Sequence, residues 1–288
     1  MKIANIGQKG IYISERGGGI EKHVREVSLR LAGRGHEVFV YARRRYTPKQ
    51  VAPIPENLHL IYLPTLYRKN FEAIVHAFFS TVHAIFQHYD IIHYHGVGPA
   101  TLAWMPRLFC PHTRIIVTFH SQDRFHQKWR WPAQQYLRFG EWAAVHFSHV
   151  CIAVSHVLQV YSREHLHRQC VYIPNGADIQ RVTSDAYLKH FGLAPNQYLL
   201  NVGRIVPQKG LQFLIAAYQQ LATDKKLVFV GAPSFSERYF AELKRLAAKN
   251  PNILFLGHQE GEALRELYAH AYFYVHPSES EGLALTVL

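Results

Sequence analysis

Short apolar runs alternate along the chain with longer segments in which apolar residues recur every three or four positions. The first run, residues 1–6, ends at Gly7 and is typical of a buried strand, and residues 19–31 then carry apolar side chains at helical spacing from Ile20 to Leu31. The same alternation predicts strands over 37–42, 58–63, 91–94, 114–119, 150–154 and 170–173, and helices over 71–88, 100–109, 132–145 and 157–166. Strands that alternate with helices form a parallel sheet with helices on both faces.

A second alternation begins after a turn at Pro174-Asn175-Gly176. The residues from there to about 195 contain no clear strand. Strands are then predicted over 198–202, 227–230, 253–256 and 272–275, and helices over 211–221, 236–248 and 262–270. We therefore expect an α/β chain of two domains, 1–175 and 176–288. Because parallel sheets bind ligands outside the carboxyl ends of their strands, we expect the functional site in a cleft between the two halves.

Composition is typical of a folded protein that does not span a membrane. Of the 288 residues, 48% are hydrophobic and 18% are charged, which predicts sizeable cores and excludes a disordered chain. The longest apolar segment, 74–86, is shorter than the ~20 residues that a membrane-spanning helix needs. The three cysteines form no C-x-x-C pair and no signal peptide follows Met1, so a reducing, cytoplasmic setting is expected.

The net charge of +12 lies almost entirely in the first half of the chain. Residues 1–174 carry 21 lysines and arginines against 10 acids, whereas residues 175–288 carry 11 against 10. Such an excess attracts an anionic partner, such as nucleic acid, an acidic membrane surface or a phosphorylated substrate. The alternative is a solvated surface whose charge keeps the protein soluble.

A glycine-rich loop, 17–19, separates the first expected strand from the first expected helix. Glycines let backbone N–H groups approach a phosphate, and the start of a helix adds partial positive charge. A glycine turn without a ligand is the alternative. The loop lacks the G-x-G-x-x-G spacing, and the end of the second strand, 41–45, lacks the acid that holds the ribose in NAD-binding folds. A dinucleotide site is therefore not expected.

The loop after the expected strand at 198–202 carries two cations. Gly203 and Arg204 follow the carboxyl end of this strand, and Lys209 lies five positions after Arg204 across a loop that contains Pro207. Two cations there can hold a diphosphate and neutralise the charge that develops as it leaves. The alternative is a pair of exposed basic residues on a surface loop.

The loop after the last expected strand contains an acid followed by a glycine, Glu281-Gly282, and then a helical apolar pattern. An acid at this position can accept hydrogen bonds from sugar hydroxyls. The backbone N–H groups of Gly282, Leu283 and Leu285 can face an anion. This loop is therefore a second candidate for binding a phosphorylated sugar.

The 20 histidines invite a metal-site interpretation that their spacing does not support. The two close doublets, at 93–95 and 165–167, have no matching cysteine or carboxylate partners, and neither H-E-x-x-H nor an Asp-x-Asp pair occurs. We therefore expect structural histidines, no metal and no other cofactor, with Arg204 and Lys209 neutralising charge instead. The absence of G-x-S-x-G and of a Walker lysine motif excludes two common hydrolase classes.

Taken in order, three segments resemble a known family. The patterns are G-G-x-E-x-H-V at 18–24, V-G-R-x-x-x-x-K-G at 202–210 and P-S-x-x-E-G-x-x-L at 277–285. Together they resemble the retaining nucleotide-sugar glycosyltransferases of glycosyltransferase family 4, and the resemblance covers the whole chain. It implies the GT-B fold of two facing Rossmann-like domains, with the acceptor side in 1–175 and the donor-binding domain in 176–288. It also implies transfer of a sugar with retention of anomeric configuration.

The resemblance also implies roles for particular residues. In the first domain, Gly18 and Gly19 would line the donor diphosphate, and His120, at the end of the 114–119 strand, matches the family's active-site histidine and would hydrogen-bond the donor sugar. In the second domain, Arg204 and Lys209, beside Gly203, would hold the phosphates of the leaving nucleotide. Glu281 would contact the sugar hydroxyls, with the amides of Gly282, Leu283 and Leu285 on the diphosphate.

The sequence departs from the family pattern at its end. The family has E-x7-E, with the second acid on the nucleotide ribose, and seven residues after Glu281 the chain stops at Leu288. We therefore expect a fragment whose second domain is truncated and which lacks the carboxylate that holds the nucleotide ribose.

The charge of the first domain fits an acceptor at a membrane, because many acceptors of this family are lipid-linked. The domain would then lie at the inner face of the cell membrane, where each cation contributes ~1 kcal/mol and tryptophan favours the headgroup region. The expected contact residues are Arg43, Arg44, Arg45, Lys128, Trp129 and Arg130. The alternative function is a non-enzymatic basic protein that binds acidic lipid or nucleic acid through 1–174. That alternative explains the charge but not Arg204, Lys209 and Glu281 at successive strand ends.

Overall fold

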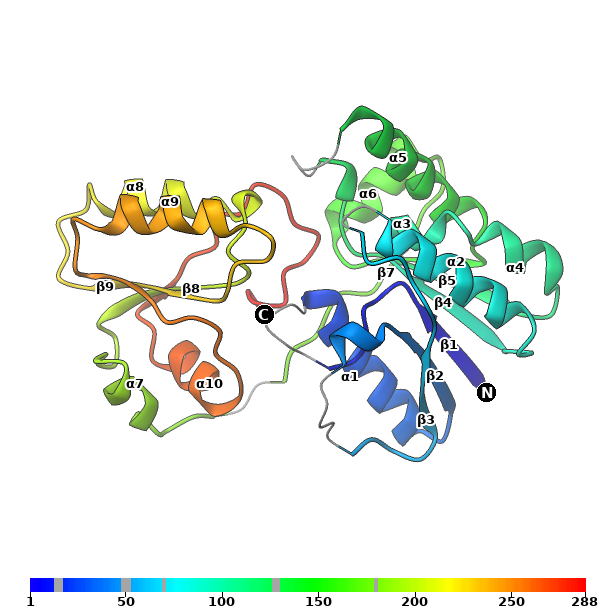
Figure 1. The fold of residues 1–288 in the computed structure, drawn as a ribbon, viewed down its shortest axis with the longest axis horizontal. Helices are drawn as coiled ribbons and strands as arrows, with labels where there is room; N and C mark the ends of the chain where they lie inside the picture. Colours follow the sequence, from blue (N-terminus) through cyan, green and yellow to red (C-terminus); the bar gives the residue numbers. More distant parts are fainter. Residues whose placement is uncertain (13–17, 48–52, 69–70, 126–129, 179–180) are drawn as a thin grey trace. The chain divides into compact units, whose positions relative to one another are not determined.

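The computed structural model of the protein describes residues 1–12, 18–47, 53–68, 71–125, 130–178 and 181–288. These residues form two compact units (Figure 1). Unit 1 comprises Met1–Asn175 with Glu281–Leu283, and unit 2 comprises Gly176–Ser280 with Ala284–Leu288. Each unit has its own parallel sheet and core, so the α/β class predicted from the alternation is confirmed. The sequence had assigned the whole of 176–288 to the second domain, whereas the structure packs Glu281–Leu283 in unit 1.

Unit 1 is built on a seven-stranded parallel sheet in the order β3-β2-β1-β4-β5-β6-β7. Its strands are β1 (Lys2–Ile6), β2 (Glu37–Ala42), β3 (Leu58–Tyr62), β4 (Ile91–His95), β5 (Arg114–Phe119), β6 (Val150–Ala153) and β7 (Val171–Tyr172). Asn5 of β1 pairs with Val40 on one side and with His93 on the other. The strand order reverses between β1 and β4, and such a reversal opens a crevice outside the carboxyl ends of the two strands.

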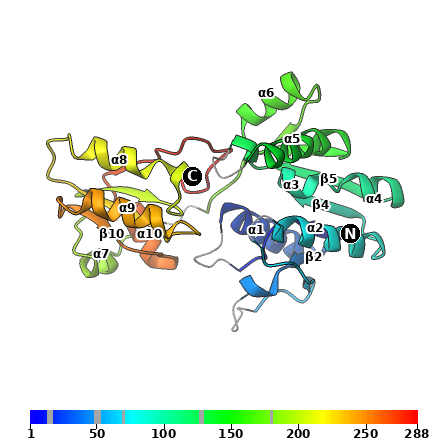
Figure 2. The ribbon, with the colours of Figure 1, turned by 45° about the horizontal axis from the view of Figure 1, so that its top comes forward.

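Helices cover both faces of this sheet. Val24 of α1 (Gly19–Gly33) packs with Val40, whereas Ala77 of α2 (Glu72–Ile85) packs with Tyr41, because neighbouring residues of a strand point to opposite faces. Helices α5 (Trp131–His146) and α6 (His156–His165) pack beside β5 and β6 (Figure 2). The helix predicted over 100–109 is instead two, α3 (Val97–Ala100) and α4 (Trp104–Phe109). Pro106 has no N–H to donate to an earlier turn, and it lies in the first turn of α4, where none is needed.

Unit 2 has a four-stranded parallel sheet in the order β10-β9-β8-β11. Its strands are β8 (Tyr198–Val202), β9 (Lys226–Val230), β10 (Ile253–Phe255) and β11 (Phe273–Tyr274). Helices α8 (Leu211–Tyr218) and α9 (Glu237–Ala247) lie on one face, and α7 (Ala186–His190) and α10 (Gly261–Ala269) lie on the other (Figure 1). The strand order reverses between β8 and β11, so the loops that follow these two strands flank the crevice of unit 2.

None of the helices in the described part of the chain combines the length and the hydropathy of a membrane span.

Candidate functional site

Three histidines from different elements meet where β4 and β5 of unit 1 end. His95 is the last residue of β4, His120 directly follows β5, and His23 lies on α1. The Nδ1 atom of His95 is 3.4 Å from Nε2 of His120, and the ring centroids of His23 and His120 are 4.8 Å apart. His95 and His120 are buried and His23 is half-buried. Of the three, only His120 was predicted to take part in the site.

Two asparagine side chains orient this cluster. Nε2 of His95 lies 3.0 Å from Oδ1 of Asn5, whose own Nδ2 donates to the Ser28 hydroxyl. Nδ1 of His23 lies 2.9 Å from Oδ1 of Asn175. A carboxamide oxygen only accepts hydrogen bonds, so the proton of His95 is on Nε2 and that of His23 is on Nδ1. The other nitrogen of each ring keeps a lone pair.

The surroundings of His95 and His120 favour the uncharged form of both rings. Burial lowers the pKa of both His95 and His120 well below the ordinary value, and the neighbouring histidines lower it further. Burial likewise lowers the pKa of His93, the neighbour that hydrogen-bonds Thr118, to about 3. His120 therefore offers a neutral imidazole, which suits hydrogen bonding to an uncharged hydroxyl better than ion pairing with a phosphate.

The segment Glu281–Leu283 packs directly on this part of unit 1. A Cβ atom at Gly282 would lie 1.7 Å from the carbonyl oxygen of His120, so only glycine fits against the main chain there. Nδ2 of Asn175 donates to the carbonyl of Leu283 at 3.0 Å. The structure thus brings His120, Gly282 and Leu283 together, and Glu281 directly precedes them. The motif is divided, because Leu285 belongs to unit 2.

The side chain of Glu21 accepts hydrogen bonds from the main chain beside the glycine loop, at the start of α1. Gly18 is the N-cap, and its N–H donates to Oε2 of Glu21 at 2.8 Å. The N–H of Lys9 donates to Oε1 of the same carboxylate at 3.1 Å. Glu21 is buried, and it therefore takes up donors that the sequence assigned to a phosphate. The role of Gly18 and Gly19 in lining the diphosphate stays a prediction.

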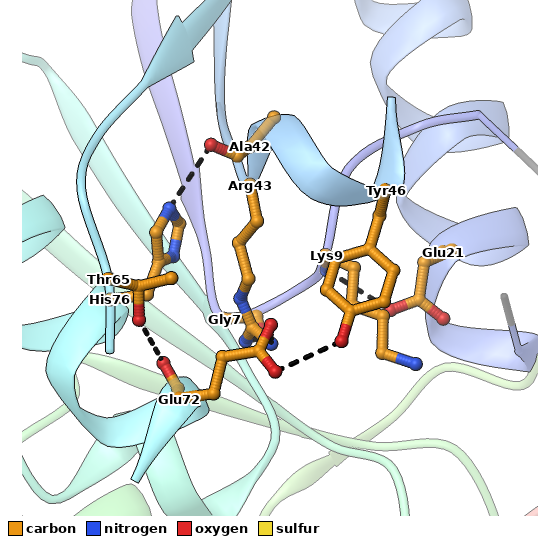
Figure 3. A network of polar contacts seen from close by, with 9 residues as sticks. All are labelled: Gly7, Lys9, Glu21, Ala42, Arg43, Tyr46, Thr65, Glu72 and His76. Carbon is orange, nitrogen blue, oxygen red and sulfur yellow. Dashed lines mark hydrogen bonds and ion pairs between the residues drawn. The ribbon is translucent and has the colours of Figure 1, made fainter. Parts of the chain in front are cut away.

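A buried ion pair lies at the carboxyl ends of β1 and β2 (Figure 3). Nη1 of Arg43 is 3.3 Å from Oε1 of Glu72, and the hydroxyl of Tyr46 donates to Oε2 of Glu72 at 3.0 Å. Nη2 of Arg43 also lies 3.5 Å from the carbonyl oxygen of Gly7. Arg43 is only 4% exposed. Its prediction as a membrane contact was therefore wrong, since its charge is compensated inside the protein.

The other basic residues proposed for that surface have different positions. Arg44 and Arg45 are exposed, and their guanidinium groups lie over the rings of Tyr62 and Tyr67. Arg130 is exposed at the N-cap of α5. Lys128 and Trp129 lie outside the described residues.

In unit 2, the loops after β8 and β11 are held together. The backbone N–H of Glu279 and the hydroxyl of Ser278 both donate to the carbonyl of Gln208, at 3.0 and 3.2 Å. A Cβ atom at Gly210 would lie 2.3 Å from the carbonyl oxygen of Pro277, and the positive φ of +64° also favours glycine there. The two loops that the sequence predicted to contact a donor thus form one structure at the crevice of unit 2.

The basic side chains of these loops, Arg204 and Lys209, lie near the end of β8. Arg204 is exposed, and the half-buried Lys209 folds back so that its Cε lies 3.7 Å from the position of a Cβ on Gly203. A Cβ on Gly231, whose φ is +143°, would come within 1.9 Å of the Gly203 carbonyl oxygen. Gly231 therefore lets the end of β9 approach the loop closely. The sequence analysis did not predict this, because the two glycines are far apart in the chain.

Family models match both parts of the chain. Residues 17–181 match the model described as Glycosyltransferase Family 4, and residues 188–288 match the model described as Glycosyl transferases group 1. Among curated proteins, the chain is 30% identical over 105 residues to O-antigen chain mannosyltransferase B of Escherichia coli, which is 35% of this chain and 28% of that protein. It is 33% identical over 90 residues to sulfoquinovosyl transferase SQD2 of Arabidopsis thaliana, which is 31% of this chain and 16% of that protein. These matches span less than a third of either relative.

Solved structures share the fold. Sucrose-phosphate synthase from Thermosynechococcus elongatus superposes with a TM-score of 0.82 at 22% identity, covering 99% of this chain and 77% of that one. Anabaena Alr3699/HepE, solved in complex with UDP-glucose, gives a TM-score of 0.71 at 20% identity, covering 96% of this chain and 74% of that one. The GT-B fold implied by the three motifs is thereby confirmed.

Proposed function

Because the chain belongs to the glycosyltransferases that carry a Glycosyltransferase Family 4 domain followed by a glycosyl transferases group 1 domain, we propose that it moves a sugar from a nucleoside diphosphate sugar to a glycan or lipid-linked glycan, with retention of anomeric configuration. The observation that carries this proposal is the contact between the loops after β8 and β11 of unit 2. The Gln208 carbonyl accepts hydrogen bonds from Ser278 and Glu279, and Lys209 lies beside Gly203. UDP-glucose in the Anabaena structure supports a donor of this class.

The cations of unit 2 would bind the leaving group. When the bond between the anomeric carbon and the phosphate oxygen breaks, negative charge develops on the departing diphosphate. Arg204 and Lys209, on a loop with a fixed main chain, would stabilise that charge. Because two cations would perform this neutralisation, we propose that transfer needs no divalent metal ion and no other cofactor.

The neutral imidazole of His120 would hydrogen-bond a hydroxyl of the donor sugar, and Glu281 would accept hydrogen bonds from others. The family's retaining mechanism is proposed here without a covalent intermediate. The acceptor oxygen bonds to the anomeric carbon on the face from which the phosphate leaves, and the acceptor's proton passes to the departing phosphate oxygen. No carboxylate nucleophile enters this sequence of steps.

The experiment that tests retention is NMR spectroscopy of the product. The purified protein is incubated with nucleoside diphosphate sugars of known anomeric configuration and with glycan or lipid-linked acceptors, with EDTA present in a parallel reaction. A product with the donor's configuration, formed equally well in EDTA, supports the proposal. A product of inverted configuration overturns the mechanism, and a requirement for divalent metal overturns the role given to the two cations.

Gly282→Ala should lower transfer by about 100-fold, because a displacement of ~1 Å near the reacting groups costs about that much. The added Cβ would overlap the His120 carbonyl oxygen, so the main chain at one of the two positions must move. Steady-state kinetics measure the effect. Gly176→Ala is the matched control, since nothing lies within 4 Å of the Cβ position there. A wild-type rate in Gly282→Ala would contradict the place given to this segment.

We also propose that unit 1 binds an acidic membrane surface at the inner face of the cell membrane, where a lipid-linked acceptor would be presented. The exposed Arg44, Arg45 and Arg130 support this, with about 1 kcal/mol expected from each cation near the surface. Unlike them, Arg43 makes no contribution.

Co-sedimentation with vesicles tests the membrane proposal. Binding to acidic vesicles should exceed binding to neutral ones, weaken as salt is raised, and fall when Arg44 and Arg45 are both replaced by serine. Equal binding to acidic and neutral vesicles would contradict it. Stronger competition by nucleic acid than by acidic lipid would favour the non-enzymatic alternative.

A further inference from the structure

The histidine cluster of unit 1 brings three possible metal ligands together. His23, His95 and His120 each offer one ring nitrogen, and these atoms all lie within 4.8 Å of one another. We propose that the three imidazoles bind a single divalent transition-metal ion such as Zn²⁺. The sequence did not indicate such a site, because its members come from α1, β4 and the end of β5 and share no spacing pattern.

One of the nitrogen separations already matches a shared ion. Two imidazole nitrogens at about 2.0–2.1 Å from a tetrahedral metal are themselves about 3.4 Å apart. Nδ1 of His95 and Nε2 of His120 are 3.4 Å apart, which is long for a hydrogen bond and fitting for two ligands. The ring centroids of the three histidines form a triangle with sides of 5.6, 4.8 and 5.7 Å. The ligand nitrogens of the cluster lie within 4.8 Å of one another, so binding one ion would draw the more distant of them closer by up to about 1.4 Å.

Hydrogen bonds outside the triangle fix two of the ligands. Metal-bound histidines typically donate their second ring N–H to an oxygen, which sets the tautomer and the ring orientation. Asn5 accepts from Nε2 of His95, and Asn175 accepts from Nδ1 of His23. The lone pairs left on Nδ1 of His95 and Nε2 of His23 belong to the atoms available to an ion. His120 joins them through Nε2 when its proton resides on Nδ1.

The ligand set selects the class of ion. Imidazole nitrogens suit Zn²⁺, Cu²⁺, Ni²⁺ and Co²⁺, whereas Mg²⁺ and Ca²⁺ require oxygen ligands. The candidate group contains no carboxylate among the described residues. Three imidazoles leave a fourth tetrahedral position for water.

The consequence for catalysis rests on the proposed function. The hydrogen bond proposed from His120 to the donor sugar would use Nε2, and an ion bound to that nitrogen would prevent it. The ion is therefore an inhibitor of transfer rather than its cofactor, and micromolar Zn²⁺ should slow a reaction that proceeds in EDTA.

Cobalt titration of the purified, chelator-treated protein tests the site without any activity assay. We expect one Co²⁺ per chain with the visible absorption of a tetrahedral complex, displaced by one equivalent of Zn²⁺. His23→Gln should weaken Co²⁺ binding at least 10-fold, and Asn175→Ala, which keeps all three ligands, should weaken it about 10-fold. The matched control is His112→Gln, at an exposed position outside the cluster, which should bind as the wild type does. Circular dichroism establishes that the variants are folded.

The proposal is overturned if no tetrahedral absorption develops, if several weak equivalent sites appear instead, or if folded His23→Gln and Asn175→Ala bind Co²⁺ as tightly as the wild type. Inhibition of sugar transfer by Zn²⁺ is measured in a separate experiment. The Zn²⁺ concentration that halves transfer should rise in Asn175→Ala by the same factor as the Kd for Co²⁺. Tight Co²⁺ binding without inhibition of transfer would overturn the inhibitory role and the place given to His120 while leaving the metal site intact.

Discussion

Alanine in place of Arg204 or Lys209 is expected to lower the rate constant of sugar transfer by at least about 100-fold in each variant. A preorganised positive charge that faces a developing negative charge contributes roughly 3 kcal/mol to the transition state. Both cations belong to a loop whose main chain is fixed before any donor arrives, because the Gln208 carbonyl accepts hydrogen bonds from Ser278 and Glu279. Removing either side chain therefore removes stabilisation that water cannot replace at the same position.

Steady-state kinetics with a saturating donor measure this effect. Arg245→Ala, at an exposed position on α9, is the matched control, because it removes one positive charge from unit 2 away from the loop. The control should retain the wild-type rate. Wild-type turnover in both Arg204→Ala and Lys209→Ala would remove these residues from the leaving-group site.

Arg43→Met is expected to lower the free energy of unfolding by about 3–5 kcal/mol, because it leaves the carboxylate of Glu72 without its buried cationic partner. The side chain of Glu72 is 14% exposed, so water compensates this charge poorly. The adjacent Arg44→Met should cost less than about 1 kcal/mol, since Arg44 is exposed and its guanidinium group lies over the face of Tyr62. The two neighbouring arginines thus form a matched pair.

Urea-induced unfolding, followed for both variants and the wild type, gives the two differences. Equal small losses would show that the Arg43–Glu72 pair contributes little to folding. Equal large losses would show that position 44 is also part of a buried structure. Either result would contradict the distinction drawn between the two arginines.

Local sequence patterns predicted most of the fold. Period-two and period-3.6 repeats are properties of single segments, and they indicated the strands and nearly all of the longer helices. The five-residue α7, Ala186–His190, was missed because it is too short to show a helical period. The division of the 100–109 helix was missed because the role of Pro106 depends on where the preceding turn ends.

The candidate site was predicted only where its residues follow strands in recognisable motifs. Arg204 and Lys209 were predicted in this way, whereas His120 was predicted from the resemblance to the family, and the roles of all three stay predictions. The approach of Gly282 to His120, the hydrogen bond from Asn175 to Leu283 and the histidine triangle all join residues far apart in the chain. Such contacts depend on tertiary packing, and no single segment contains a signal for them.

Arg43 illustrates the limit of reasoning from charge. In the run of three arginines at 43–45, the sequence presents three equivalent cations. The end of β2 directs the first of them inward to Glu72, some thirty residues later in the chain, and leaves the next two exposed. A net charge therefore describes a domain, but it does not show which of its side chains reach a partner.

Sugar transfer from a nucleoside diphosphate donor is the activity proposed for this chain. Its most direct test is the acceptor-dependent release of nucleoside diphosphate from a panel of UDP-, GDP- and ADP-sugars by the purified full chain. We expect at least one donor to be consumed, with one sugar appearing on the acceptor for each nucleoside diphosphate released. Failure of the folded protein to bind or consume any donor of the panel, with every glycan and lipid-linked acceptor, would contradict the claim.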